Sequence, residues 1–109
     1  MTVREPTPAT LRKYGLSPDQ WRKMLQEQGG VCAICRKVPK SGRLCIDHYH
    51  AKGFKHMTAD DKRRHVRGLC CSYCNRYKVA KLDLTSSRAV VAYLEKHMTR
   101  TAEVTNAGG

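Results

Sequence analysis

Large apolar side chains are scarce in this chain. Its 109 residues include one Trp and one Phe, and its apolar stretches are short and interrupted by charged residues. A domain of this size gains only modest stability from burial, so a thin core usually needs disulfides or a metal ion to hold it together. The sequence therefore predicts a single small domain that carries one of these two cross-links.

The chain also lacks the patterns that direct a protein into or across a membrane. Its first residues, Met1 to Pro6, do not combine a basic segment with an apolar one as a secretory signal does. No apolar run approaches the roughly 20 residues of a membrane helix. We therefore expect a cytoplasmic protein without a membrane partner, in which zinc is favoured over the disulfides that six cysteines would allow.

Acidic residues are few. Nine Asp and Glu stand against 21 Lys and Arg, which gives a net charge of +12. A small domain needs a net charge of only about 2 to 8 to stay in solution. The larger excess creates a positive potential over much of the surface, which suits a polyanion. The composition therefore indicates nucleic acid as the partner rather than charge kept for solubility alone.

The sequence does contain two cysteine pairs with the same close spacing, Cys32 with Cys35 and Cys71 with Cys74. Tetrahedral zinc accepts four thiolates, and each two-residue gap places two sulfurs on one side of the ion. Cys70 would leave a looser gap to Cys74 and is the alternative to Cys71. We predict a structural zinc ion held by the two pairs, and we interpret Cys70 as a small buried side chain.

A second group of polar residues lies between and just after the cysteine pairs. A four-thiolate zinc site has no open coordination position, so any reaction needs another centre. Asp47 offers hard oxygen donors for Mg²⁺ or Mn²⁺, and His48 titrates near neutral pH and can take a proton from water. Neighbours on a strand point to opposite faces, so both serve one site only if the strand bends or ends there. His50 would orient the phosphate or support the base, and Asn75 would cap a helix, join the site, or both.

The remaining pattern predicts a mixed α+β chain. The first expected helix starts with a capping box at Ser17-Pro18-Asp19-Gln20 and stops at Gly29-Gly30. Strands are expected at 43–50 and 66–69, with an exposed basic loop at 51–65 between them. A helical turn over 71–78 follows, and a last helix, capped by Thr85 or Ser86, runs to about His97. Around them we expect a flexible arm over residues 1–10, a domain over 11–98 and a disordered tail over 99–109.

Three segments in this order carry a family resemblance. They are Gly29-Gly-Val-Cys-Ala-Ile-Cys35, Ile46-Asp-His-Tyr-His50 and Val66-Arg-Gly-Leu-Cys-Cys-Ser-Tyr-Cys-Asn75. From about Leu11 to Leu94 the chain resembles the recombination endonuclease VII family, which belongs to the HNH, or ββα-metal, nucleases common in bacteriophages. The resemblance implies a small zinc-stapled ββα-metal (His-Me finger) domain with flanking N- and C-terminal helices.

The resemblance also implies an activity and a role in it for each site residue. The chain would be a metal-dependent DNA endonuclease that nicks or cuts duplex or branched DNA and leaves 5′-phosphate and 3′-hydroxyl ends. Asp47 and Asn75 would hold a catalytic Mg²⁺ or Mn²⁺, and His48 would be the general base. A phage-encoded member would work in the host cytoplasm as a monomer or weak homodimer, beside phage packaging or recombination proteins.

Basic residues gather near the candidate site, and we expect them to contact DNA phosphates. They are Lys52, Lys55, Arg63, Arg64, Arg67 and Lys78. Two features depart from the family pattern. The segment 52–65 is longer and more basic than the family's compact loop, and Lys78 stands where the junction-resolving member is expected to carry an acidic group.

Two other functions fit parts of the same sequence. A non-catalytic zinc module would bind nucleic acid through its charge and would cleave nothing when Mg²⁺ or Mn²⁺ is added. A zinc-ribbon or RING-like adaptor would bind proteins, would have little affinity for nucleic acid and would not need Asp47, His48 or Asn75. The nuclease is the function that accounts for all three of these residues.

Overall fold

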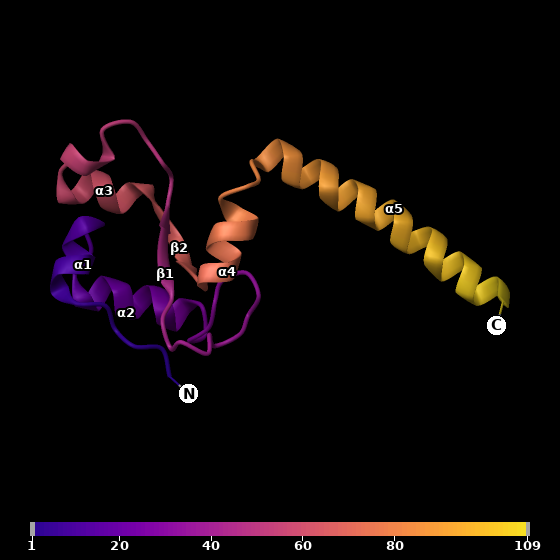
Figure 1. The fold of residues 1–109 in the computed structure, drawn as a ribbon, viewed down its shortest axis with the longest axis horizontal. Helices are drawn as coiled ribbons and strands as arrows, with labels where there is room; N and C mark the ends of the chain where they lie inside the picture. The colour runs from indigo at the N-terminus through magenta and orange to yellow at the C-terminus, as the bar shows by residue number, and fades with distance from the viewer. Residues whose placement is uncertain (1, 109) are drawn as a thin grey trace.

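Helices surround a small two-stranded sheet in the computed structural model, which describes the backbone of residues 2–108 and the side chains of residues 2–98 (Figure 1). The elements are α1 (Pro8–Lys13), α2 (Pro18–Glu27), β1 (Cys45–His48), the 3₁₀ helix η1 (Phe54–His56), α3 (Ala59–His65), β2 (Val66–Cys70), α4 (Ser72–Cys74), the π-helical turn η2 (Asn75–Val79) and α5 (Leu84–Gly108). This mixture confirms the predicted α+β class. No described helix is both long and apolar enough to span a membrane.

Helix α2 begins as the sequence predicts. The Ser17 hydroxyl accepts a hydrogen bond from the Gln20 backbone N–H at 3.1 Å, and the Gln20 side chain accepts one from the Ser17 N–H at 2.8 Å. This capping box satisfies two N–H groups that have no partner within the helix. The apolar face of α2 points inward, where Trp21 is 2% exposed. Trp21 joins a core of Leu11, Leu16, Cys32, Leu44, Ile46, Leu69, Cys70 and Cys74.

The side chain of Gln28 connects the end of α2 to β2. Its amide nitrogen donates to the carbonyl oxygens of Val31 and Leu69, and its amide oxygen accepts from the Leu69 N–H, each at 2.9 Å. These bonds satisfy backbone N–H and C=O groups that do not pair within the two-stranded sheet. Strands β1 and β2 pair antiparallel, with Cys45 opposite Cys70.

Residues 51–65 do not form the exposed loop that the sequence suggested. They contain η1 and the helix α3, which Thr58 caps by accepting the Asp61 N–H at 3.2 Å. Asp60 and Asp61 lie in the first turn of α3 and basic residues lie in the last, the arrangement that the helix dipole favours. Arg63 pairs with Asp60, and Arg64 with Asp61. The charges that suggested a solvated loop therefore stabilise a helix.

A close backbone approach fixes α3 against the turn between α1 and α2. Gly15 has a positive φ of +70°, and a Cβ added there would lie 2.0 Å from the carbonyl oxygen of Ala59. Arg63 strengthens the contact by donating to the Gly15 carbonyl oxygen at 3.3 Å. Only glycine fits this conformation and this distance together.

The two ends of the chain differ from the expected boundaries. Helix α1 starts at Pro8, inside the expected arm, and the Arg4 N–H donates to the Gly42 carbonyl at 2.7 Å.

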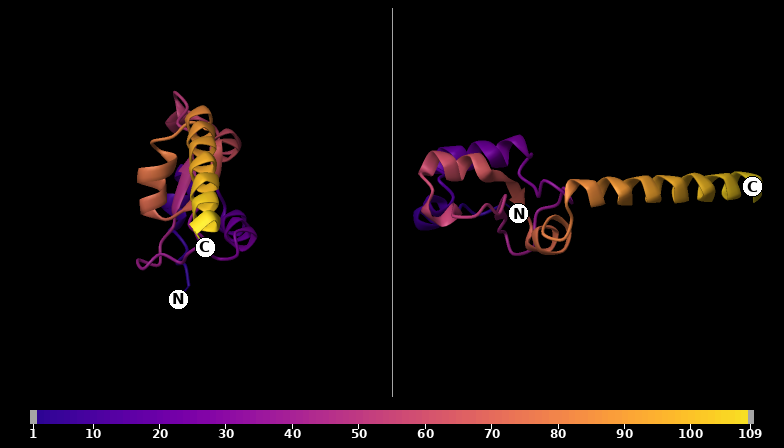
Figure 2. Two further views of the ribbon diagram at one scale, coloured as in Figure 1. Left: turned by 90° about the vertical axis from the view of Figure 1, so that its right-hand side faces the viewer. Right: turned by 90° about the horizontal axis from the view of Figure 1, so that it is seen from above.

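At the other end α5 extends away from the remaining elements (Figures 1 and 2). Asp83 caps it by accepting the Ser86 N–H at 2.6 Å, so the expected cap at Thr85 or Ser86 was wrong. The helix passes His97 because no Pro or Gly interrupts the sequence before Gly108. The expected tail falls largely on residues whose side chains lie outside the described part, and its disorder stays a prediction.

Candidate active site

The four cysteines predicted to bind zinc form one cluster. Their sulfur atoms all lie within 4.8 Å of one another, as the ligands of a tetrahedral zinc ion do. The turn from Cys32 to Cys35 supplies two of them. Cys71, which caps α4, and Cys74, the last residue of α4, supply the other two. Cys32 Sγ accepts hydrogen bonds from the N–H groups of Cys71 at 3.3 Å and Ile34 at 3.4 Å. The cluster therefore suits a structural zinc ion, with thiolate charge supported by the backbone.

Thiol acidity differs within the cluster and does not by itself separate its members from Cys70. Burial, followed by the side-chain hydrogen bond with Cys71, raises the pKa of the cluster member Cys74 to about 12. Burial raises the pKa of Cys32, but N–H donors from Cys71, Cys35 and Ile34 outweigh it and lower that pKa to about 6. Burial, followed by the charge on Cys32, raises the pKa of Cys70 to about 12. Cys70 lies outside the sulfur cluster. The geometry assigns the ligand position to Cys71 rather than Cys70, as the two-residue spacing predicts.

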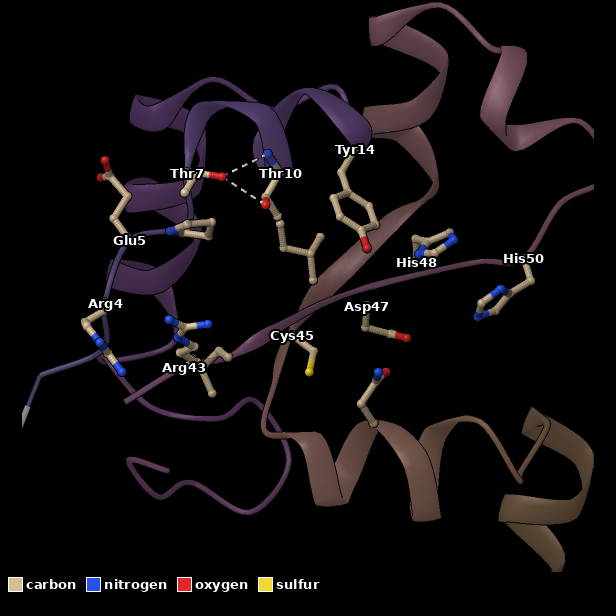
Figure 3. A pocket seen from close by; sticks show the side chains of 14 residues that line it. Arg4, Glu5, Thr7, Thr10, Tyr14, Arg43, Cys45, Asp47, His48 and His50 are labelled. Atoms are coloured by element: carbon tan, nitrogen blue, oxygen red, sulfur yellow. Dashed lines mark hydrogen bonds between the residues drawn. The ribbon is translucent and has the colours of Figure 1, made fainter. Parts of the chain in front are cut away.

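Asp47, His48, His50 and Asn75 line a single pocket of about 550 Å³ (Figure 3). The first two lie at the end of β1, His50 follows that strand, and Asn75 begins η2. Irregular π-helical turns of this kind occur frequently at functional sites. The structure thus brings together all four residues that the sequence marked as catalytic.

A bulge in the sheet lets the neighbours Asp47 and His48 face the same pocket. Asp47 lies opposite Gly68, but His48 lies opposite Val66, so Arg67 is an extra residue on β2. Such bulges bend a strand and re-aim its side chains. The bend that the sequence analysis required is therefore present at the expected place.

Aromatic rings hold the imidazole of His48. Phe54 stacks on it with ring centroids 4.4 Å apart, Tyr14 meets it edge-on at 5.3 Å, and His50 lies at 4.5 Å. Burial, followed by the charge of His50, lowers the pKa of His48, while Asp47 and a backbone hydrogen bond with Ile46 act in the opposite direction. The ring is therefore neutral near neutral pH, the form that accepts a proton.

Asp47 is held by Arg67 across the bulge. Asp47 is 5% exposed, and its carboxylate accepts two hydrogen bonds, from Arg67 Nε at 2.8 Å and from Arg67 Nη2 at 3.0 Å. The hydrogen bond with Asp47 raises the pKa of Arg67. Each carboxylate oxygen has a further acceptor position. The carboxylate of Asp47 and the amide oxygen of Asn75 are oxygen donors of the kind that a divalent ion such as Mg²⁺ or Mn²⁺ prefers.

The basic residues predicted to contact DNA lie outside the pocket wall. Lys52, Lys55, Arg64 and Lys78 are exposed, Arg63 is half-buried, and Arg67 pairs with Asp47 while its side chain stays 45% exposed. The cations that do line the pocket are Arg4 and Arg43, which the sequence analysis missed. Arg43 lies just before β1, which begins at Cys45. No sequence pattern linked Tyr14 or Phe54 to His48.

Comparisons with known proteins identify relatives of this chain. A family model described as recombination endonuclease VII matches residues 8–96. The gene 59 protein of Mycobacterium phage L5 is 37% identical over 68 residues, and that of Mycobacterium phage D29 is 35% identical over 68 residues, in both cases 62% of this chain. The chain spans about a third of the length of these curated relatives, 35% and 34%. No solved structure matches it.

Proposed function

The chain belongs to the recombination endonuclease VII family, and from that premise we propose that it is an HNH-type DNA endonuclease that needs a divalent ion. It hydrolyses a phosphodiester bond and leaves 5′-phosphate and 3′-hydroxyl ends. The observation that carries the proposal is the convergence of Asp47, His48 and Asn75 on one pocket beside a four-cysteine cluster. A zinc module that only bound DNA would not need this convergence.

His48 is the general base in this proposal. Its lowered pKa keeps the ring neutral, and its contacts with Phe54 and Tyr14 fix the direction of the ring nitrogens. A water molecule in the pocket gives its proton to His48 as its oxygen attacks phosphorus. His50, beside the His48 ring, orients the phosphate. The base is thus positioned before the substrate arrives.

Asp47 and Asn75 would hold the Mg²⁺ or Mn²⁺ ion, which when bound would neutralise charge on the phosphate and stabilise the departing 3′ oxygen. Arg67 keeps the Asp47 carboxylate in place through two hydrogen bonds. The cysteine cluster contributes no reacting group, because four thiolates saturate zinc.

The DNA strand approaches along a basic surface. Arg4 and Arg43 line the pocket, and the exposed cations outside it extend the positive surface toward flanking phosphates. The catalytic domain in this proposal covers residues 11–98 and acts in the host cytoplasm on duplex or branched DNA, as a monomer or weak homodimer.

Nicking of supercoiled plasmid tests the proposal. Zinc-loaded protein with added Mg²⁺ or Mn²⁺ should nick the plasmid, and His48→Ala should lower the rate about 100-fold or more, because positioned bases contribute on that order. His56→Ala is the matched control, since it removes an exposed histidine on η1 that does not line the pocket. If His48→Ala nicks as fast as the parent, the proposal fails. Tight duplex binding without any nicking would favour the non-catalytic module.

A further inference from the structure

The pocket has cationic groups without matching acidic ones. Among the described residues that line it, the carboxylates are Glu5 and Asp47, and arginines pair with both. Arg43 lines the same pocket and makes no ion pair within the described part of the chain. The local charge therefore attracts an anion and gives little attraction to a free divalent cation.

Arg67 is the cause of this imbalance at the ion position. It donates to both oxygens of Asp47, and Asp47 is the one carboxylate near Asn75 in the described pocket wall. A guanidinium bound to a ligand carboxylate cancels its charge and repels a dication at the same oxygens. Because Asp47 is nearly buried, solvent screens this repulsion only in part.

We propose that the DNA phosphate supplies the missing negative charge, so that the divalent ion and DNA bind cooperatively and Arg67 sets the strength of that coupling. This inference rests on the proposed nuclease function and concerns the same site. The free protein binds Mg²⁺ or Mn²⁺ weakly. By linkage, DNA raises the affinity for the ion by the same factor by which the ion raises the affinity for DNA. The protein then carries its ion mainly when a phosphate is in place.

Binding of Mn²⁺, followed by the electron paramagnetic resonance signal of the free ion, tests this without measuring activity. Zinc-loaded full-length protein carrying His48→Ala is titrated with Mn²⁺, alone and with a short duplex, and the duplex alone provides the DNA background. The duplex should tighten Mn²⁺ binding to the protein about tenfold or more, which corresponds to a typical coupling between sites. Equal affinity with and without duplex would overturn the proposal.

Variants of Arg67 test whether its positive charge is what weakens Mn²⁺ binding to the DNA-free protein. Arg67→Gln should tighten Mn²⁺ binding to the DNA-free protein about tenfold and reduce the effect of DNA, because it removes the repelling charge. Arg67→Lys keeps the charge and should bind Mn²⁺ as weakly as the parent. Arg88→Gln makes the same charge change on the exposed surface of α5, outside the pocket wall, and should leave Mn²⁺ binding unchanged with and without duplex. Zinc content and circular dichroism check that each variant is folded.

Unchanged or weaker Mn²⁺ binding by folded Arg67→Gln would show that Arg67 only orients Asp47, and the proposal would be wrong. That outcome differs from failure of the nuclease function. A protein that nicks plasmid normally but binds Mn²⁺ without regard to DNA refutes the coupling alone. A protein that nicks nothing refutes the function.

Discussion

The catalytic role proposed for His48 depends on the side chains that hold its ring. Phe54 covers one face of the imidazole. Tyr14 meets it edge-on from the end of α1 (Figure 3). Neither ring reaches the reacting atoms in the proposed mechanism. Their contribution is to fix orientation, which matters because small displacements of a catalytic group reduce rates strongly.

Removal of the Phe54 ring should therefore slow cleavage without abolishing it. Phe54→Ala is expected to lower the nicking rate about 10- to 100-fold through misorientation of His48. Phe54→Leu keeps an apolar contact and should lose less. Tyr93→Ala removes an aromatic ring from α5 that is 72% exposed and should leave the rate unchanged. Parental rates for Phe54→Ala, in protein shown to be folded, would contradict the role given to this ring.

The adjacent cysteines Cys70 and Cys71 should behave differently when each is replaced by serine. Cys71→Ser removes a member of the sulfur cluster and should lose the zinc ion, whereas Cys70→Ser should keep one zinc per chain. The reason is that Cys70 lies outside the cluster of four sulfur atoms, whereas Cys71 belongs to it. Metal analysis after gel filtration measures the zinc content of both variants. Retention of zinc by Cys71→Ser together with its loss from Cys70→Ser would reverse the assignment.

Among the secondary structure elements, the bulge between β1 and β2 and the packing of α3 do most to shape the site. The bulge at Arg67 turns Asp47 and His48 toward one pocket. Helix α3 follows η1, which carries Phe54, and it is anchored through the contact of Gly15 with Ala59. A loss of this anchor should disturb both stability and the wall around His48.

Two glycines with similar backbone conformations provide a matched test of that anchor. Gly15→Ala places a methyl group 2.0 Å from the Ala59 carbonyl oxygen, while Gly30→Ala at φ +77° meets no atom within 4 Å. The strain of a positive φ costs about 1 to 3 kcal/mol in either variant, and the clash adds to it only at Gly15. Urea denaturation of the zinc-loaded proteins should show Gly15→Ala to be the less stable. Equal stability would show that α3 can move away freely.

Sequence patterns predict the elements whose signals lie within a few residues, and they miss features that depend on contacts between distant parts of the chain. The capping box at Ser17 and Gln20 and the spacing of the cysteine pairs are local, and the structure confirms both. The helix α3 also had a local signal in its Thr58 cap, but its dense charge suggested a loop. The pairing of Arg67 with Asp47 could not be predicted, because it depends on a shift of one residue in strand register.

The whole molecule combines two centres on a small scaffold. The cysteine cluster connects the turn after α2 to the start of α4, and α4 leads directly into Asn75. Zinc binding to such clusters contributes about 10 to 16 kcal/mol, which is large compared with the stability that a thin core provides. In the proposed mechanism, the zinc ion would therefore bring Asp47 and Asn75 together without taking part in the reaction.

Removal of zinc should therefore unfold the domain. A strong chelator is expected to abolish the helical circular dichroism signal of α1 to α4 and to expose all six cysteines to a thiol reagent. Added zinc under reducing conditions should restore the signal. An unchanged spectrum after verified loss of zinc would contradict the structural role of the cluster.

The most direct test of the central claim, that a second centre distinct from zinc performs the chemistry, is the nicking rate of Asp47→Asn. This variant keeps the shape of the side chain but removes its charge. We expect it to retain one zinc per chain and a parental circular dichroism spectrum. With Mg²⁺ or Mn²⁺ it should nick supercoiled plasmid at least about 100-fold more slowly than the parent, because loss of transition-state charge stabilisation has an effect on this scale. A zinc-loaded, folded Asp47→Asn protein that nicks at the parental rate would contradict the account.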